Sequence, residues 1–344
     1  MLQVPVSGFF CFTKAKYLTY ANLTDANLTN VSSMFNMYQC SGGSVLSTII
    51  FNNTHIQNAS FNSFICNNTA ITSIDLTGLV FDVKPTSVSA LFSDNSNLSE
   101  IIGIEDLPVE NVSVFMNCFS GCTSLLDFSF LEKWDISSGT DYRGMFRNCK
   151  MESLPLPALI QGNVFDYMFS GCTNLIDLSG ITFEDLTRNS DGDNATGGMR
   201  EMFSGCTKLK SIGKLINRGA LRSTFYGCSN LSYIEEFNFD NYTDDTPYYT
   251  DTYLIFQNAY TGTVSMKFTG TTPKGFTGSA NNNTWSRPDF DHDSLLSLFN
   301  CLNPNGPGTG IGSASYPLKL NSKSLARMSD DEIAIATAKG WTIA

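Results

Sequence analysis

One octapeptide is repeated almost unchanged in this chain, and it constrains the fold more than any other feature. Met168–Leu175 reads Met-Phe-Ser-Gly-Cys-Thr-Asn-Leu, and Met202–Leu209 differs from it at a single position. Looser copies lie at Phe119–Leu125, Met145–Cys149 and Phe225–Leu231. Near-identical segments in one chain indicate a repeat architecture, in which each copy is one structural unit stacked on the next.

The spacing of the copies is regular. Phe35 and Phe256 begin and end a series of phenylalanines that spans 221 residues in eight steps, a mean near 28. This period lies within the range of leucine-rich repeats. The landmark residues are Phe35, Phe64, Phe92, Phe119, Phe146, Phe169, Phe203, Phe225 and Phe256.

Each repeat unit, here called a coil, has three parts in the sequence. Before the phenylalanine, apolar residues lie at Val164 and then three and four positions later, at Tyr167 and Met168. This spacing predicts one or two helical turns facing inward. Ser-Gly-Cys-Thr-Asn predicts a turn, because glycine readily adopts a positive φ. After Leu175 and Leu209, apolar residues alternate as in a strand. Stacked coils would place these strands in a parallel ladder.

The predicted fold class is therefore an α/β repeat. It is a leucine-rich-repeat solenoid with a parallel β ladder, short helical or 3-10 turns, and a small α/β C-terminal cap. The predicted domains are an N-terminal lead-in at 1–30, about nine repeats at 31–262, an irregular linker at 263–290 and a capping region at 291–344. A solenoid needs such a cap to cover its last open coil.

The capping region carries recognisable helix signals. Asp293–Leu302 has the apolar pattern of a helix, and Ser329 with Glu332 forms a capping box before a second helical stretch. We expect Phe299 and Trp341 to cover the end of the array, together with Leu296 and Ile333.

The repeats resemble a known family. Phe-Ser-Gly-Cys-Thr-Asn-Leu followed by a short strand is similar to the BspA-like leucine-rich repeat, in its Met-Phe-x-x-Cys variant, over about 30–262. The resemblance is closest at 115–235 and looser in the first three copies. The tail from Leu325 to Ile343 resembles endings of such arrays in gut bacteria and their phages. The resemblance implies surface adhesion or host contact and supplies no catalytic residues.

Ten cysteines require an explanation, and five of them follow a landmark phenylalanine by three residues. Neighbouring parallel strands lie about 4.8 Å apart, so parallel side chains keep their Cβ atoms farther apart than the ~3.8 Å usual in disulfides. A column of buried thiols is therefore favoured over disulfides or a metal string. The five are Cys122, Cys149, Cys172, Cys206 and Cys228.

Other candidate chemistry is sparse, and the predictions for metals, cofactors and catalysis are all negative. His55 and His292 are the two histidines, and Asp289–Asp293 could be a metal or catalytic cluster, but a helix cap explains those aspartates better. Asp191-Gly-Asp-Asn194 is part of a calcium-loop pattern without its terminal glutamate, which favours a solvated loop.

Charge and hydropathy exclude some partners. The net charge is −11, from 21 basic and 32 acidic residues, which argues against nucleic acid and anionic lipid. No apolar run reaches the roughly 18 residues of a membrane span, so no membrane insertion is expected. Val6–Phe12 lacks the flanks of a signal peptide. We therefore expect either no conventional export or a leader that was removed.

Recognition is expected where the repeats vary. Two long polar insertions, 187–198 and 241–253, interrupt the period, and the second is acidic and rich in tyrosine. Tyr248, Tyr249 and Tyr253 are the candidate binding residues, because loop aromatics can stack on a sugar or anchor a protein. Packing of these rings back onto the array is the alternative interpretation.

The predicted function is non-enzymatic binding or structure. The leading hypothesis is a phage virion component, a fibre or capsid decoration, that attaches to protein or carbohydrate surfaces and contacts other virion proteins. Its location would be the virion, and a homo-oligomer remains open. The alternative is a secreted or cell-surface bacterial adhesin. A carbohydrate-active enzyme ranks third, since it would need paired carboxylates in a cleft.

Overall fold

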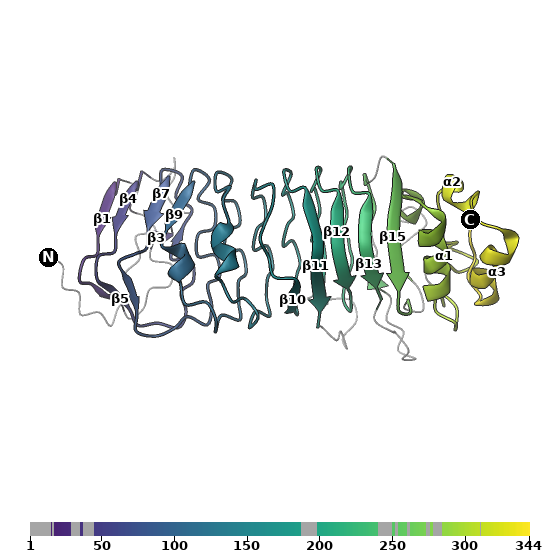
Figure 1. The fold of residues 1–344 in the computed structure, drawn as a ribbon, viewed down its shortest axis with the longest axis horizontal. Helices are drawn as coiled ribbons and strands as arrows, with labels where there is room; N and C mark the ends of the chain where they lie inside the picture. Colours follow the sequence, from purple (N-terminus) through teal and green to yellow (C-terminus); the bar gives the residue numbers. More distant parts are fainter. Residues whose placement is uncertain are drawn as a thin grey trace. The chain divides into compact units, whose positions relative to one another are not determined.

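The computed structural model describes the chain in two compact units, Met1–Leu156 and Pro157–Ala344 (Figure 1). Each unit is described by itself. Both consist mainly of parallel β-sheet with few helices, which agrees with the predicted parallel ladder. The described residues are 15, 17–28, 35–36, 45–186, 198–239, 250–251, 254–259, 262–272, 276–277, 284–309 and 311–344.

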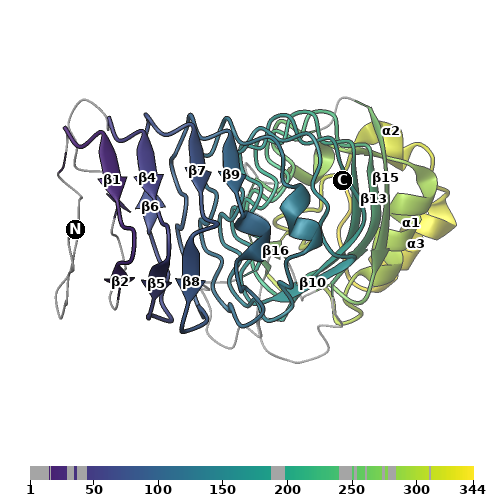
Figure 2. The ribbon, with the colours of Figure 1, turned by 60° about the vertical axis from the view of Figure 1, so that its left-hand side comes forward.

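The first unit contains short strands in small parallel sheets, ordered β1-β4, β2-β5-β8, β3-β6 and β7-β9. Figure 2 shows β1, β4, β7 and β9 following one another along the unit. Two 3-10 helices, η1 (Ile104–Asp106) and η2 (Ser129–Glu132), lie later in this unit. The strands are β1 (Tyr20–Asn22), β2 (Asn27–Leu28), β3 (Phe35–Asn36), β4 (Thr48–Ile50), β5 (Thr54–Ile56), β6 (Ile65–Cys66), β7 (Ser73–Asp75), β8 (Leu79–Phe81) and β9 (Glu100–Ile102).

The second unit is built on a six-stranded parallel sheet in the order β10-β11-β12-β13-β15-β17. A separate pair joins β14 (Thr250–Asp251) to β16 (Phe276–Thr277). Its helices are η4 (Thr284–Ser286), α1 (His292–Cys301), α2 (Ser322–Leu325) and α3 (Asp330–Ala338). The strands of the large sheet are β10 (Leu159–Gly162), β11 (Asp177–Asp185), β12 (Ser211–Ile216), β13 (Tyr233–Asn238), β15 (Thr263–Thr269) and β17 (Asp289–Phe290).

The segment before the landmark phenylalanine is a run of β-turns, so the predicted helical turns at this position are wrong. The amide of Met168 donates to the Phe165 carbonyl, and the amide of Cys172 donates to the Phe169 carbonyl. The third residue of the first turn, Tyr167, has a φ of 61°. A residue in this left-handed region ends a right-handed helix but suits the third position of a β-turn.

The backbone amides that do not close these turns donate hydrogen bonds to the next coil. Phe165, Tyr167 and Phe169 donate to the carbonyls of Gly198, Arg200 and Met202, at 2.8, 2.8 and 2.9 Å. Alternate amides therefore form a parallel ladder while the others close turns. Apolar residues at positions i, i+3 and i+4 are typical of a helix, but here they occur in β-turns, which also direct apolar side chains inward.

The landmark phenylalanines stack on one another within each unit. Phe92, Phe119 and Phe146 have ring centroids 5.8 and 6.0 Å apart with nearly parallel planes. The landmark position predicted at Phe64 is one residue too early, because the backbone of Phe35 pairs with Ile65 rather than with Phe64. Both Phe64 and Ile65 are fully buried, so hydrophobicity alone could not separate these adjacent positions.

The five cysteines that follow a landmark phenylalanine by three residues are here called the register cysteines. They are buried thiols that form no disulfide, in agreement with the predicted column. The Sγ of Cys122 lies 3.0 Å from the Phe92 carbonyl, and that of Cys228 lies 3.0 Å from the Phe203 carbonyl. Asn95 holds the equivalent position in an earlier coil, and its Nδ2 donates to the Ile65 carbonyl at 2.8 Å. The position therefore supplies a donor to the preceding coil, and cysteine and asparagine both meet that requirement.

The predicted irregular linker at 263–290 begins with a strand. β15 pairs in parallel with β13, and its side chains alternate, with Val264, Met266 and Phe268 buried. The Thr-Val-Ser-Met-Lys-Phe-Thr sequence carries the period-two signal. It was missed because no Phe-x-x-Cys motif precedes this strand in the sequence.

Helix α1 covers β15. The amides of Met266 and Phe268 donate to the hydroxyls of Ser294 and Ser297, at 2.7 and 3.0 Å. Polar side chains of the helix thus satisfy backbone donors of the strand, which an uncovered edge would leave open to another chain. This arrangement is what a terminal cap requires.

The remaining cap predictions are met in part. The helix expected at Asp293–Leu302 is α1, and Ser329 with Glu332 forms the predicted capping box of α3. Phe299 and Trp341 are buried, whereas Leu296 and Ile333 are half-buried. A single parallel bridge joins Leu318 to Ile343.

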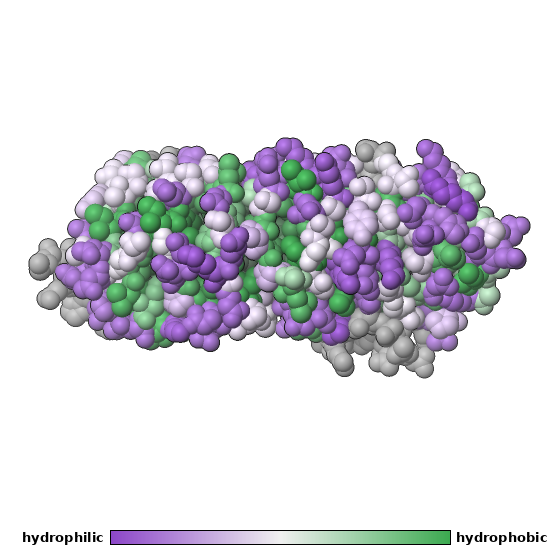
Figure 3. All heavy atoms as spheres, viewed as in Figure 1, coloured by the Kyte–Doolittle hydropathy of each residue, from purple (hydrophilic) through white to green (hydrophobic). Residues whose placement is uncertain are grey.

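The surface is of mixed polarity. Figure 3 shows polar areas alternating with small apolar ones on the visible face. Among the described residues, the large apolar side chains that are exposed include Tyr17, Tyr20, Val45, Val80, Val83, Ile102, Leu126, Leu159, Leu186, Tyr233 and Tyr316.

Candidate functional site

The predicted binding tyrosines, Tyr248, Tyr249 and Tyr253, lie outside the described residues. The strands that precede the two insertions in the sequence are described. β11 ends at Asp185 and β13 ends at Asn238. The strands are parallel, and Glu184, the residue before the end of β11, is in register with Asn238 through Ile216 of β12, so both strands end on the same side of the sheet. We call this the binding edge.

The residues at the binding edge form a polar cluster. The Glu184 carboxylate accepts a hydrogen bond from the side-chain Nε2 of Gln161 at 2.7 Å and lies 3.6 Å from the Arg218 guanidinium. The amide of Arg218 donates to the Asp185 carboxylate at 3.3 Å. Charged side chains at this edge are therefore held in place by neighbouring strands.

Asn217 and Asn238 continue the cluster along the edge. The amide of Asn217 donates to the Asn238 carbonyl at 2.9 Å, and its side chain donates to the Gly219 carbonyl at 3.1 Å. Asn238 Nδ2 donates to the Thr269 hydroxyl at 2.9 Å. Its neighbour Glu236 accepts from the same hydroxyl, and this hydrogen bond contributes most to lowering the pKa of Glu236 below its ordinary value.

The binding edge was not predicted from the sequence. Glu184-Asp185 and Asn238 come just before the two insertions, and their position at strand ends is the signal that could have indicated it. Arg218 and Asn217 could not be assigned without the register of β12 against its neighbours.

The acidic segment before α1 provides helix capping, in agreement with the sequence interpretation. Asp291 is the N-cap of α1, and its carboxylate accepts from the Ser294 amide at 2.8 Å. Asp289 binds the Arg327 guanidinium at 2.6 Å, and this bond lowers the pKa of Asp289. These contacts hold structural elements together.

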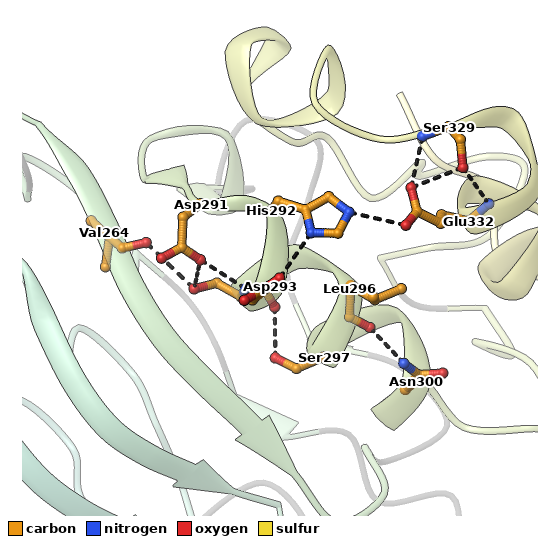
Figure 4. A network of polar contacts seen from close by, with 10 residues as sticks. Val264, Asp291, His292, Asp293, Leu296, Ser297, Asn300, Ser329 and Glu332 are labelled. Atoms are coloured by element: carbon orange, nitrogen blue, oxygen red, sulfur yellow. Dashed lines mark hydrogen bonds and ion pairs between the residues drawn. The ribbon is translucent and has the colours of Figure 1, made fainter.

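His292 lies between two carboxylates (Figure 4). Its Nδ1 is 2.9 Å from Asp293 and its Nε2 is 2.9 Å from Glu332. Hydrogen bonds to Asp293, and then to Glu332, raise the pKa of His292. The Ser329 amide and hydroxyl, followed by His292, lower the pKa of Glu332 to about 2. Both shifts favour the charged form of the group concerned.

The other histidine forms a simpler contact. His55 Nδ1 lies 3.0 Å from the Asp82 carboxylate, and Gln57 donates to the same carboxylate at 3.3 Å. This arrangement pairs side chains of neighbouring coils. It places no serine or cysteine nucleophile beside the imidazole among the contacts of the described chain.

Three of the five register thiols, together with the thiol of Cys118, are poor nucleophiles. Burial raises the pKa of Cys118, Cys122 and Cys228 well above the ordinary thiol value, and that of Cys149 to about 12. A thiol becomes reactive or binds metal as the thiolate, which burial disfavours here.

The described residues contain no group of three or more histidine, cysteine, aspartate or glutamate side chains placed to hold a metal ion. None of the helices in these residues has the length and apolar character needed to cross a bilayer.

The comparisons with known proteins give one match. A family profile described as "Mycoplasma protein of unknown function, DUF285" matches residues 77–177. This stretch contains the coils of Phe92, Phe119 and Phe146 and is less than a third of the 344 residues. The match is consistent with a BspA-like family. No curated protein and no solved structure matches the chain.

Proposed function

We propose that this chain is a non-enzymatic binding protein built on a leucine-rich-repeat solenoid, in which the binding edge presents the two insertions to a partner. The single observation that carries the proposal is that β11 and β13 run parallel and end within one residue of the same register, so the chain enters both insertions from one edge. Coil-to-coil hydrogen bonds and stacked landmark rings within each unit support the solenoid.

The partner we propose is a protein or carbohydrate surface, contacted through Tyr248, Tyr249 and Tyr253. These three tyrosines belong to an acidic insertion of the sequence. Tyrosine offers a large rigid ring and a hydroxyl at low entropic cost, which suits both sugars and proteins. The net charge of −11 argues against a nucleic-acid partner.

The location we propose is a phage virion, as a fibre or capsid decoration that mediates attachment. Eight described cysteines are free, and this supports assembly in a reducing cytoplasm, where virions form. The alternative is a bacterial adhesin at the cell surface. It is favoured by the family profile at 77–177, whose description names a cellular organism, Mycoplasma.

The test of binding replaces the three insertion tyrosines by alanine and measures attachment to host cells and to glycans. Loss of a central aromatic anchor costs about 2 kcal/mol or more, so attachment is expected to weaken at least about thirtyfold. Matched controls are Tyr233→Ala and Tyr316→Ala, whose side chains are exposed and lie outside the insertions in the sequence. Unchanged attachment in the triple variant would contradict the proposed site.

The test of location uses antibodies against the chain. Labelling of purified intact particles is the expected result for a virion component. Labelling of bacterial cells without labelling of particles would overturn the virion placement and favour the adhesin.

A further inference from the structure

We propose that the contact of His292 with Asp293 and Glu332 is a pH-sensitive clasp, which holds the start of α3 on α1 while the imidazole is protonated and loosens as rising pH removes that proton. The two helices come from distant parts of the capping region, and His292 and Glu332 are 40 residues apart. The proposal is independent of the proposed function, because it concerns the cap and not the insertions.

The geometry requires a protonated imidazole. An imidazole nitrogen can donate to a carboxylate only when it carries a hydrogen, and neutral histidine has one such nitrogen. Here both nitrogens face carboxylates at 2.9 Å. Loss of the proton therefore turns one of the two hydrogen bonds into a contact between a lone pair and a carboxylate.

The charges around His292 favour the proton. On α1, Asp293 contacts the ring and Asp291 is the N-cap; on α3, Glu332 contacts the ring. These carboxylates outweigh the N-terminus of α1, which by itself disfavours a cation.

The cations near the clasp are engaged elsewhere. On β17, Asp289 is neutralised by Arg327, which precedes α3 and also donates to the Phe290 carbonyl at 2.8 Å. The Lys339 ammonium donates to the Phe299 and Asn300 carbonyls at 3.0 and 2.7 Å. The positive charge that faces the Asp293 and Glu332 carboxylates is therefore that of the His292 imidazolium, which is lost when the ring is deprotonated.

The sign of the pH effect follows from the direction of the shift. The pKa of His292 is raised in the folded chain, so its contribution is fully present below the ordinary histidine pKa. It is lost as pH rises through the raised value. Glu332, whose pKa is lowered to about 2, remains ionised over this range and does not limit the clasp.

Two other attachments of the cap do not depend on the proton of His292. Arg327 binds Asp289, and the indole of Trp341 donates to the Asn303 carbonyl at 3.0 Å. Loosening should therefore be confined to the first turn of α3, while the chain beyond Ala338 stays docked.

The experiment is hydrogen exchange of the full chain at pH 5.5 and pH 8.5, with the intrinsic exchange rates corrected. Peptides that cover Ser329–Ile333 are compared with peptides that cover Trp341. Contacts between exposed charges contribute little, so protection of the first turn is expected to fall only about 1.4- to fivefold at the higher pH. Protection around Trp341 is expected to stay constant.

Two variants separate the clasp from general destabilisation. His292→Gln cannot gain a proton, so its first-turn protection should not change with pH. Arg327→Gln weakens the cap by removing a group that stays charged throughout, so it should keep the pH dependence of the unmodified chain. A flat profile in the unmodified chain, or a pH dependence that persists in His292→Gln, would overturn the proposal.

An NMR titration gives a second measurement. The imidazole of His292 should titrate above its ordinary pKa in the unmodified chain, and Glu332→Gln should move that value back toward the ordinary one. An unchanged titration in Glu332→Gln would show that α3 does not hold the proton, and the proposal would fail.

Discussion

The two units use the same turns but different strands. In the first unit the described strands are two or three residues long, and bridges at Ser60, Ser87, Val114 and Asp141 recur every 27 residues. In the second unit, β11 has nine residues and β15 has seven. The common element is the ladder of β-turns around the landmark ring, so strand length can vary while the repeat is preserved.

The largest expected effect comes from removing a landmark ring. Phe119 in the first unit stacks on Phe92 and Phe146 and also contacts Phe128, Phe130 and Trp134. Phe203 in the second unit stacks on two landmarks and contacts Phe183. Truncation of a buried phenylalanine costs about 3–5 kcal/mol. We expect Phe119→Ala to lie at the upper end and Phe203→Ala at the lower end, measured by urea unfolding.

The control for this comparison is Leu126→Ala in the first unit, since that side chain is 60% exposed. A surface change of this kind should alter the free energy of unfolding by no more than about 0.5 kcal/mol. A larger loss in Phe203→Ala than in Phe119→Ala would show that strand length, rather than ring packing, sets local stability.

The repeat and the cap could be predicted because each has a local sequence signature. The Phe-x-x-Cys-x-x-Leu pattern fixes the turn ladder, and the Ser329–Glu332 capping box marks the start of α3. The choice between helix and β-turn before the phenylalanine could not be made from spacing, because both direct apolar residues inward every three or four positions. Positive φ at a residue such as Tyr167 is not encoded by its identity.

Contacts between distant segments were beyond the sequence. The link between His292 and Glu332, and the serine hydroxyls of α1 on β15, depend on how the chain returns to itself. The binding edge likewise depends on strand register. The prediction for Tyr248, Tyr249 and Tyr253 stays a prediction.

A smaller loss of stability is expected when the side-chain donor three residues after a landmark phenylalanine is removed. Asn95 donates to the Ile65 and Phe92 carbonyls at 2.8 and 2.9 Å and accepts from the Asn68 amide at 2.8 Å. Asn95→Ala leaves three buried backbone groups without these partners, which should cost about 2–4 kcal/mol. Cys206→Ala in the second unit removes one weak thiol donor and should cost about 1–2 kcal/mol.

The substitution Asn95→Cys refines this comparison. A thiol restores a donor toward the Ile65 carbonyl but gives the Asn68 amide no amide oxygen. We expect a loss of stability between those of the two alanine variants, measured by thermal and urea unfolding. Equal losses in Asn95→Ala and Asn95→Cys would mean that the thiol is only a space-filling group at this position.

The smallest expected effects concern surface ion pairs, one in each unit. Lys84 pairs with Glu110 in the first unit, whereas Lys214 lies 3.5 Å from Glu235 and 3.7 Å from Glu236 in the second. These groups are substantially exposed, so Lys84→Met or Lys214→Met should cost about 0.5 kcal/mol or less. About 1 M salt should remove most of either effect.

The pH dependence distinguishes the two pairs. The pKa of Glu110 is lowered chiefly by Lys84, whereas that of Glu236 is lowered chiefly by the Thr269 hydroxyl. Both contributions are present above the ordinary glutamate pKa and are lost as pH falls through the lowered values. Lys84→Met should therefore move the NMR-titrated pKa of Glu110 back toward its ordinary value, while Lys214→Met should leave most of the Glu236 shift in place. Equal responses of the two glutamates would mean that the hydroxyl of β15 does not hold the carboxylate of β13, and that both units stabilise their surface charges by ion pairing alone.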